Sequence, residues 1–77
     1  MQTDTAVAEA METLTRLLFA EVTKLYHAAG RAHAYMEEDR RFAAIGSLLE
    51  AEEAKRHTAQ LFDAIRTLNR LNPQNNP

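Results

Sequence analysis

The residues best placed to do chemistry are Glu53 and His57, which lie in the charged segment EAEEAKRH at residues 50–57. If this segment is helical, a spacing of four residues puts the carboxylate and the imidazole on the same helix face. Both groups are common ligands of divalent metal ions, and Glu21 from another part of the chain could supply a third ligand. The segment therefore raises the hypothesis of a small metal-binding helical bundle that is assembled across subunits.

Two features of the same segment favour a structural role instead. Metal-binding four-helix bundles use the spacing Glu-x-x-His, whereas here the histidine comes one position later. Residues of opposite charge four positions apart, Glu52 with Arg56 and Glu53 with His57, stabilise a solvent-exposed helix. We therefore predict that the chain binds no metal and no other cofactor, and we keep a metal site of Glu53, His57 and Glu21 as the alternative.

The composition and the motifs argue against several other classes of function. The chain has 77 residues, no cysteine and a net charge of -2, and its basic clusters at residues 40–41 and 55–57 are short, so nucleic-acid binding is not expected. No nucleophile motif or glycine-rich phosphate loop is present, so we expect no enzymatic activity. The longest fully apolar run covers residues 17–20, far fewer than the roughly 20 residues of a membrane span, and we expect no signal peptide because no basic segment precedes an apolar core. These features predict a cytoplasmic protein that does not enter the membrane.

Apolar residues recur every three or four positions through the first half of the chain, which predicts one long amphipathic helix. Two successive steps of four, from Leu14 to Leu18 and on to Val22, depart from a strict heptad and predict a nearly straight helix. Gly30 could break this helix, but the apolar stripe keeps its phase across it, so we expect the helix to continue. The predicted stripe consists of Val7, Met11, Leu14, Leu18, Val22, Leu25, Ala29, Ala32 and Met36.

An antiparallel helical hairpin with two arms of equal length needs a turn near residue 39. A turn at residues 30–34 is the alternative, because it would put the acidic residues 37–39 in the first turn of the second helix. With the turn near residue 39, Leu18 faces Phe62 at the centre of the seam between the arms. The predicted stripe of the second arm, about residues 40–71, consists of Ala44, Leu48, Ala51, Ala54, Thr58, Leu61, Phe62, Ile65 and Leu68.

Gly46 and Ser47 mark a second place where a helix could be interrupted. The sequence from Ser47 to Glu50 matches a capping box, which could begin a new helix at Ser47. A new helix there would fold Phe42 and Ile45 back into a three-helix core. The same match is common inside continuous helices, so we expect the second arm to be continuous.

The domain boundaries follow from the proline positions and from the ends of these patterns. Pro73 and Pro77 lie in a polar tail, so residues 72–77 should be disordered, and residues 1–4 should be flexible. Residues 5–71 then form one all-α domain, the helical hairpin. A chain of this length buries only about 60% of its unfolded surface, so a lone hairpin would be marginally stable and a second subunit is expected.

The first arm is apolar over about 200° of its circumference, at about 100° per residue, whereas one partner helix covers only about 100°. The apolar surface that one partner helix leaves uncovered has to contact another helix, a second subunit or another protein. On the second arm, Phe42, Ile45 and Leu49 lie at positions i, i+3 and i+7, away from the predicted seam, and form a compact apolar patch. We therefore expect a homodimeric four-helix bundle that acts as an adaptor, inhibitor or regulator of a protein partner. The predicted interface residues are Leu17, Phe19, Tyr26, His33, Tyr35, Phe42, Ile45 and Leu49.

Overall fold

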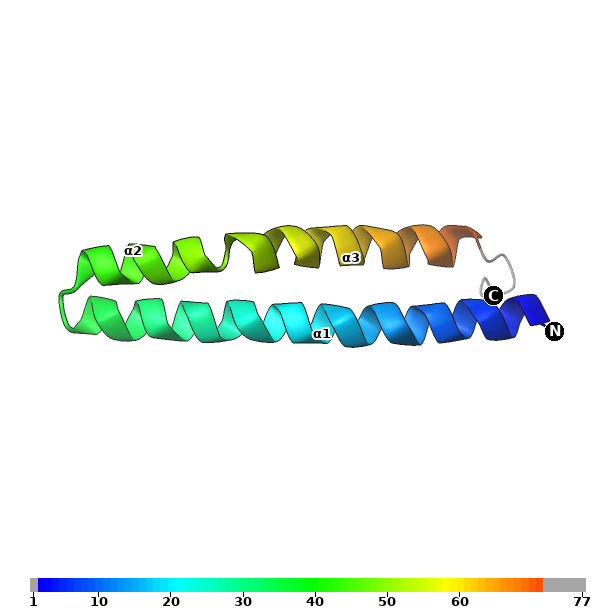
Figure 1. The fold of residues 1–77 in the computed structure, drawn as a ribbon, viewed down its shortest axis with the longest axis horizontal. Coiled ribbons are helices and arrows are strands. Elements are labelled where there is room, and N and C mark those ends of the chain that lie inside the picture. Colours follow the sequence, from blue (N-terminus) through cyan, green and yellow to red (C-terminus); the bar gives the residue numbers. More distant parts are fainter. Residues whose placement is uncertain (1, 72–77) are drawn as a thin grey trace.

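The computed structural model describes residues 2–71, with side chains from Thr5 onward, as three helices (Figure 1). These are α1 (Gln2–Glu37), α2 (Arg41–Glu50) and α3 (Glu52–Leu71). No strand occurs in this part of the chain, so the all-α prediction is confirmed. Helix α1 begins inside the segment 1–4 that we expected to be flexible, and the predicted tail 72–77 lies outside the described residues. None of the described helices is both long and apolar enough to cross a bilayer.

The chain reverses direction at residues 38–40, close to the predicted turn. Asp39 has a φ of 61°, in the left-handed region that usually ends a helix with glycine but tolerates aspartate. The Arg40 N–H donates to the Tyr35 carbonyl at 2.8 Å and the Asp39 N–H donates to the Met36 carbonyl at 3.0 Å, which together form a Schellman motif. The alternative turn at residues 30–34 is wrong, and Gly30 lies inside α1 as expected.

The second arm is interrupted at Ala51, so the prediction of a continuous helix there is wrong. The break also comes later than the two positions considered, because Gly46 and Ser47 both lie inside α2. At Ala51 φ is -94° and ψ is 6°, and its N–H donates to the Leu48 carbonyl at 3.1 Å, one residue short of α-helical spacing. The break places Glu52 and Glu53 in the first turn of α3, where carboxylates interact favourably with the positive end of the helix.

Side-chain burial gives the seam of α1 a phase that differs from the predicted stripe. Glu21, Ala28 and Tyr35 take the places that we assigned to Val22, Ala29 and Met36, all of which are exposed. With these three residues the steps alternate strictly between four and three, which is a heptad pattern, so the predicted departure from a heptad is wrong. Apart from Ala10 and Thr23, the positions from residue 5 onward in α1 that are not exposed are Val7, Met11, Leu14, Leu18, Glu21, Leu25, Ala28, Ala32 and Tyr35.

The second arm shows the same alternation across the break at Ala51. Leu48 and Phe62, which we placed in its stripe, are 49% and 53% exposed. At these levels the seam holds Ser47, which was not predicted, and Leu61, which was. Small side chains fill the half of the seam near the turn, and larger ones fill the half near the chain ends. The seam positions of this arm are Ala44, Ser47, Ala51, Ala54, Thr58, Leu61, Ile65 and Leu68.

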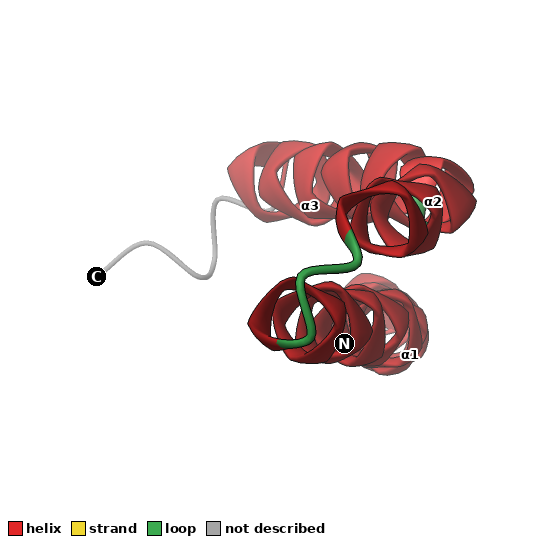
Figure 2. Cartoon of the chain, turned by 90° about the vertical axis from the view of Figure 1, so that its left-hand side faces the viewer, coloured by secondary structure: helices red, strands yellow, loops and turns green. Residues whose placement is uncertain are grey.

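The two arms form a single layer, as the end-on view in Figure 2 shows. The molecule measures 56 × 21 × 14 Å, and its shortest dimension is close to the diameter of one helix. Within the described residues no large side chain is fully buried, and the buried positions hold only alanines and Ser47. Both broad faces of this single layer are therefore uncovered. Because domains usually consist of two packed layers, either face could take part in a further contact.

Candidate interaction surface

One broad face carries a second stripe of α1, which we call the outer stripe. It consists of Phe19, Val22, Tyr26, Ala29, His33 and Met36, all exposed, and its steps alternate between three and four like those of the seam. Phe19 and Tyr26 are 74% and 76% exposed. This spacing keeps the stripe directly beside the seam along the whole of its length, so it presents a continuous, mostly apolar ridge.

The second arm adds apolar side chains to the same face. Leu48 and Phe62 flank its seam on the side away from Glu50 and His57, and Ile45 lies next to Leu48. All three apolar side chains are about half-exposed. We call this surface, formed by the outer stripe together with Ile45, Leu48 and Phe62, the apolar face.

Phe42 and Leu49 lie at the outer edge of α2, beyond the apolar face. They are 94% and 62% exposed, and they adjoin Ile45 as the spacing predicted. The exposure of Phe42 and the position of Gly46 inside α2 exclude the alternative in which α2 folds back to form a three-helix core.

Three other predicted interface residues lie in different surroundings. Leu17 is half-exposed on the opposite broad face, where it lines a groove of about 410 Å³ together with Leu61. Tyr35 is a seam residue at the turn, and the guanidinium carbon of Arg40 lies 4.8 Å from the centre of its ring. His33 belongs to the outer stripe, and its Nε2 is 3.6 Å from a Glu37 carboxylate oxygen. The predicted residues are therefore not brought together into one patch.

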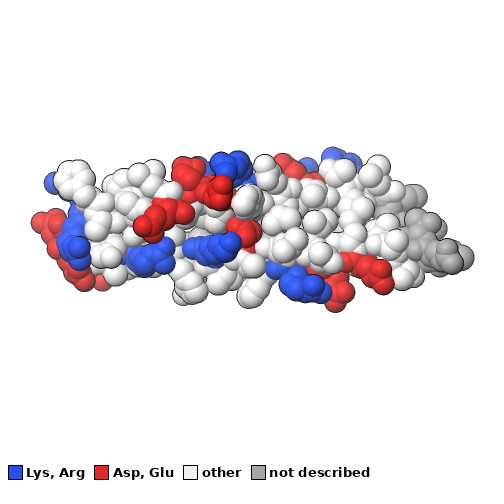
Figure 3. Space-filling model, in the orientation of Figure 1, with Lys and Arg blue, Asp and Glu red and all other residues white. Residues whose placement is uncertain are grey.

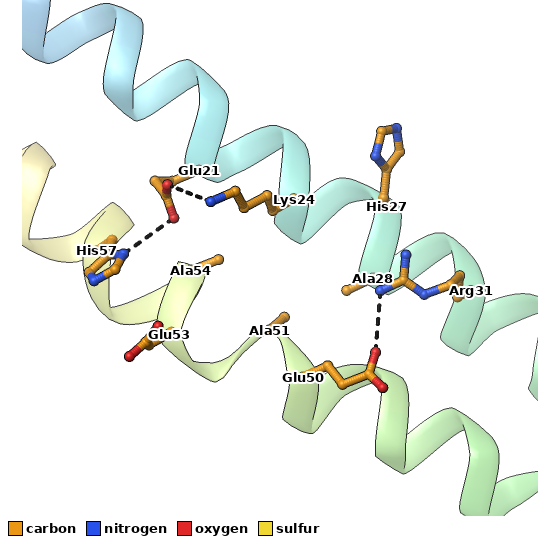
Figure 4. Close-up of a pocket in the computed structure, with 10 residues that line it drawn as sticks. All are labelled: Glu21, Lys24, His27, Ala28, Arg31, Glu50, Ala51, Glu53, Ala54 and His57. Atoms are coloured by element: carbon orange, nitrogen blue, oxygen red, sulfur yellow. Dashed lines mark hydrogen bonds and ion pairs between the residues drawn. The ribbon is translucent and has the colours of Figure 1, made fainter.

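The opposite broad face is charged in the middle of the molecule, where side chains of both signs gather between the arms (Figure 3). A groove of about 390 Å³ lies here, and its lining includes Ala28, Ala51 and Ala54 of the seam (Figure 4). Its charges are largely paired, since Arg31 lies 3.8 Å from Glu50 of the other arm. The charged residues and histidines that line it are Glu21, Lys24, His27, Arg31, Glu50, Glu53 and His57.

Glu21 makes a polar layer in the otherwise mostly apolar seam, and the side chain is only 15% exposed. Its Oε2 accepts a hydrogen bond from Lys24 Nζ at 2.9 Å, while its Oε1 lies 3.4 Å from His57 Nδ1. Oε1 is buried and accepts no hydrogen bond of good geometry, and the neighbouring Thr58 hydroxyl oxygen is also buried without a hydrogen bond. The hydrogen bond from Lys24 lowers the Glu21 pKa; burial opposes this shift, and His57 adds to it.

The structure brings together only two of the three residues of the candidate metal site. Glu21 and His57 come together across the seam, but Glu53 turns away from them (Figure 4). Glu53 instead pairs with Arg56 at 3.2 Å. No group of three or more potential metal ligands is found among the described residues. The predicted stripe of α1 contained Val22 and did not include Glu21, so the burial of this carboxylate in the seam was not predicted.

Comparisons with other proteins leave the chain without an assigned family. Protein-family models, curated proteins and solved structures gave no match to this sequence. Its function therefore has to be inferred from its own surfaces. Of these, the apolar face is the one whose exposed large apolar side chains the fold of a single chain does not explain.

Proposed function

We propose that this chain is a small helical interaction protein that works as a homodimer. Two antiparallel hairpins pack their apolar faces together and form a four-helix bundle. The observation that carries this proposal is the outer stripe, a second heptad pattern whose residues are all exposed on a layer one helix thick. A heptad spacing is typical of a helix surface that packs against another helix.

The size of the broad face is compatible with a stable dimer. The layer measures 56 by 21 Å, on the order of 1,000 Å², and the outer stripe occupies about 25 Å of this length. Because a stable interface buries about 800 Å² on each partner, the contact would extend beyond the outer stripe over both arms. Burying a large apolar side chain stabilises an assembly by about 1.5–3 kcal/mol. The face offers several such side chains, among them Phe19, Tyr26 and Phe62, so dimerisation would provide the burial that the single layer lacks.

The α2 edge supports a role as an adaptor, inhibitor or regulator. Phe42 and Leu49 lie outside the apolar face, so they stay accessible in the proposed dimer. Apolar anchors on one side of a helix are a common means of recognising the groove of a protein partner. The dimer would thus present two copies of this edge, and occupation of a partner's surface would be its mode of action.

Sedimentation equilibrium at micromolar concentration tests the dimer. The native chain should sediment at about twice its monomer mass of 8.7 kDa. Tyr26→Asp places a charge in the middle of the outer stripe and should yield a monomer that keeps its helical circular dichroism. The matched control is the next residue, His27→Asp, which should remain dimeric because His27 lines the groove on the charged broad face. A stable, folded native monomer at this concentration would overturn the proposal.

A further inference from the structure

We infer that, in the proposed dimer, α1 of one copy packs antiparallel against α1 of the second copy. The contact is centred on the outer stripe, with Tyr26 of each copy opposite Ala29 of the other. This inference rests on the proposed function, because it specifies which helices meet when the two apolar faces come together.

The length and spacing of the outer stripe support a pairing of α1 with itself. The stripe runs from Phe19 to Met36, about 25 Å at 1.5 Å per residue. Its alternating steps keep its side chains in line with those of an adjacent helix over this whole distance. A two-fold axis perpendicular to α1 then brings the same stripe of both copies together, as a symmetric dimer requires.

The sizes of the side chains match when the two stripes run in opposite directions. Antiparallel pairing about the middle of the stripe sets the large Tyr26 against the small Ala29 of the second copy, so the ring has room. It also sets Phe19 against Met36, and a thioether sulfur beside an aromatic ring is a favourable contact. A parallel pairing in register would instead place Tyr26 against Tyr26 and Phe19 against Phe19.

The charges on α3 argue against the other symmetric arrangement, in which α1 packs on α3 of the second copy. In that arrangement Val22 and Tyr26 would meet the part of α3 that carries Glu52 and Lys55. These two residues form an exposed ion pair at 3.3 Å. Covering them with apolar side chains would remove water from both charges, which is costly. The outer stripe has no Asp, Glu, Lys or Arg, so packing α1 on α1 brings no charged side chain of the second copy's stripe against Val22 or Tyr26.

Disulfide cross-linking can test the pairing, because the native chain has no cysteine. In the double variant Phe19→Cys/Met36→Cys, each introduced thiol should lie opposite a thiol of the second copy. Within one chain these positions are about 25 Å apart along α1, far beyond the roughly 7 Å limit between Cα atoms for a disulfide. Mild oxidation should therefore convert most of the double variant into a covalent dimer. Each single variant should give little covalent dimer, because its two thiols lie at opposite ends of the contact.

A second pair of positions is needed because replacing Phe19 and Met36 could itself weaken association. Val22→Cys/His33→Cys removes less apolar surface and should cross-link in the same way, whereas each of its single variants should not. A native dimer by sedimentation that gives no cross-link with either pair would overturn the inference and leave the proposed function standing. Equal cross-linking of the single and double variants would also overturn it. A monomeric native chain would instead overturn the proposed function itself.

Discussion

Glu21 and His57 face one another across the seam, with Oε1 of the carboxylate 3.4 Å from Nδ1 of the imidazole. Glu21 occupies a heptad position that is apolar at most other levels, and Lys24 holds its second oxygen. A charged layer of this kind seldom adds stability, because the loss of hydration offsets the attraction between the charges. The charged layer can instead fix the register of the two arms, because any shift of one arm along the other would separate Glu21 from His57.

The first prediction is that Glu21→Leu raises the stability of the fold. Leucine at this position would complete the apolar seam next to Leu18 and Leu25, and it would remove the buried Oε1 atom that lacks a hydrogen bond. The midpoint of urea unfolding at pH 7 should rise. Glu12→Leu is the control, because Glu12 is exposed and lies 3.9 Å from Arg16, and it should change the midpoint little. A lower midpoint for Glu21→Leu would show that the polar layer stabilises the fold.

The second prediction concerns pH. The Glu21 pKa is lowered from its ordinary value of 4.5, chiefly by the hydrogen bond from Lys24. Relative to its protonated form, the ionised form therefore stabilises the fold above about pH 4.5, and this contribution is lost as the pH falls through the lower value of the folded state. Glu21→Gln removes the titration, so below about pH 4.5 the native chain should lose stability more steeply than the variant. Unfolding curves from pH 3 to 7 would test this, and parallel pH profiles would contradict it.

Sequence patterns predicted the helical class, the position of the turn and the continuity of α1 through Gly30, because these depend on local spacing. They did not give the phase of the seam, since a search for apolar residues selects Val22 over the charged Glu21. The partners of Glu21, which are Lys24 on the same helix and His57 across the seam, show why a carboxylate is tolerated there. The break at Ala51 has no glycine or proline to signal it, so it could not be read from local sequence preferences.

The candidate site was predicted in part for similar reasons. Phe19, Tyr26 and Phe42 are exposed, as the surplus of apolar residues suggested. Leu17 and Tyr35 were grouped with them, although the corrected phase of α1 turns Leu17 to the other broad face and Tyr35 into the seam. A helical wheel gives the angle of each side chain, but it does not show which side of the wheel the second arm covers.

The third prediction tests the seam itself. Leu18 is partly buried at the level of Leu61, so Leu18→Ala should lower the free energy of unfolding by roughly 2–3 kcal/mol through lost burial and a residual cavity. His27→Ala should change it by less than about 0.5 kcal/mol, because His27 is exposed. Chemical unfolding of both variants at one protein concentration gives the comparison. Equal losses would mean that the faces of α1 are assigned wrongly.

The fourth prediction concerns Gly46, which lies inside α2. A Cβ atom added at Gly46 would meet no atom within 4 Å apart from its chain neighbours and the nearby backbone of α2 itself, so alanine fits without strain. Because glycine costs a helix about 1 kcal/mol relative to alanine, Gly46→Ala should stabilise the chain by about 0.5–1 kcal/mol. Thermal unfolding would show this as a higher midpoint. A lower midpoint would indicate that another chain approaches α2 closely at this position.

The fifth prediction separates the apolar face from the outer edge of α2. Ile45 lies on the apolar face and Phe42 lies beyond it, although the two residues are only three positions apart. Ile45→Asp should introduce a charge into the dimer contact and weaken self-association by at least tenfold, while helical circular dichroism is retained. Phe42→Asp adds the same charge at a side chain that is 94% exposed, and it should leave the dimer intact. Sedimentation of both variants beside the native chain decides the matter, because equal weakening would place the outer edge of α2 inside the dimer contact instead of leaving it free for a partner.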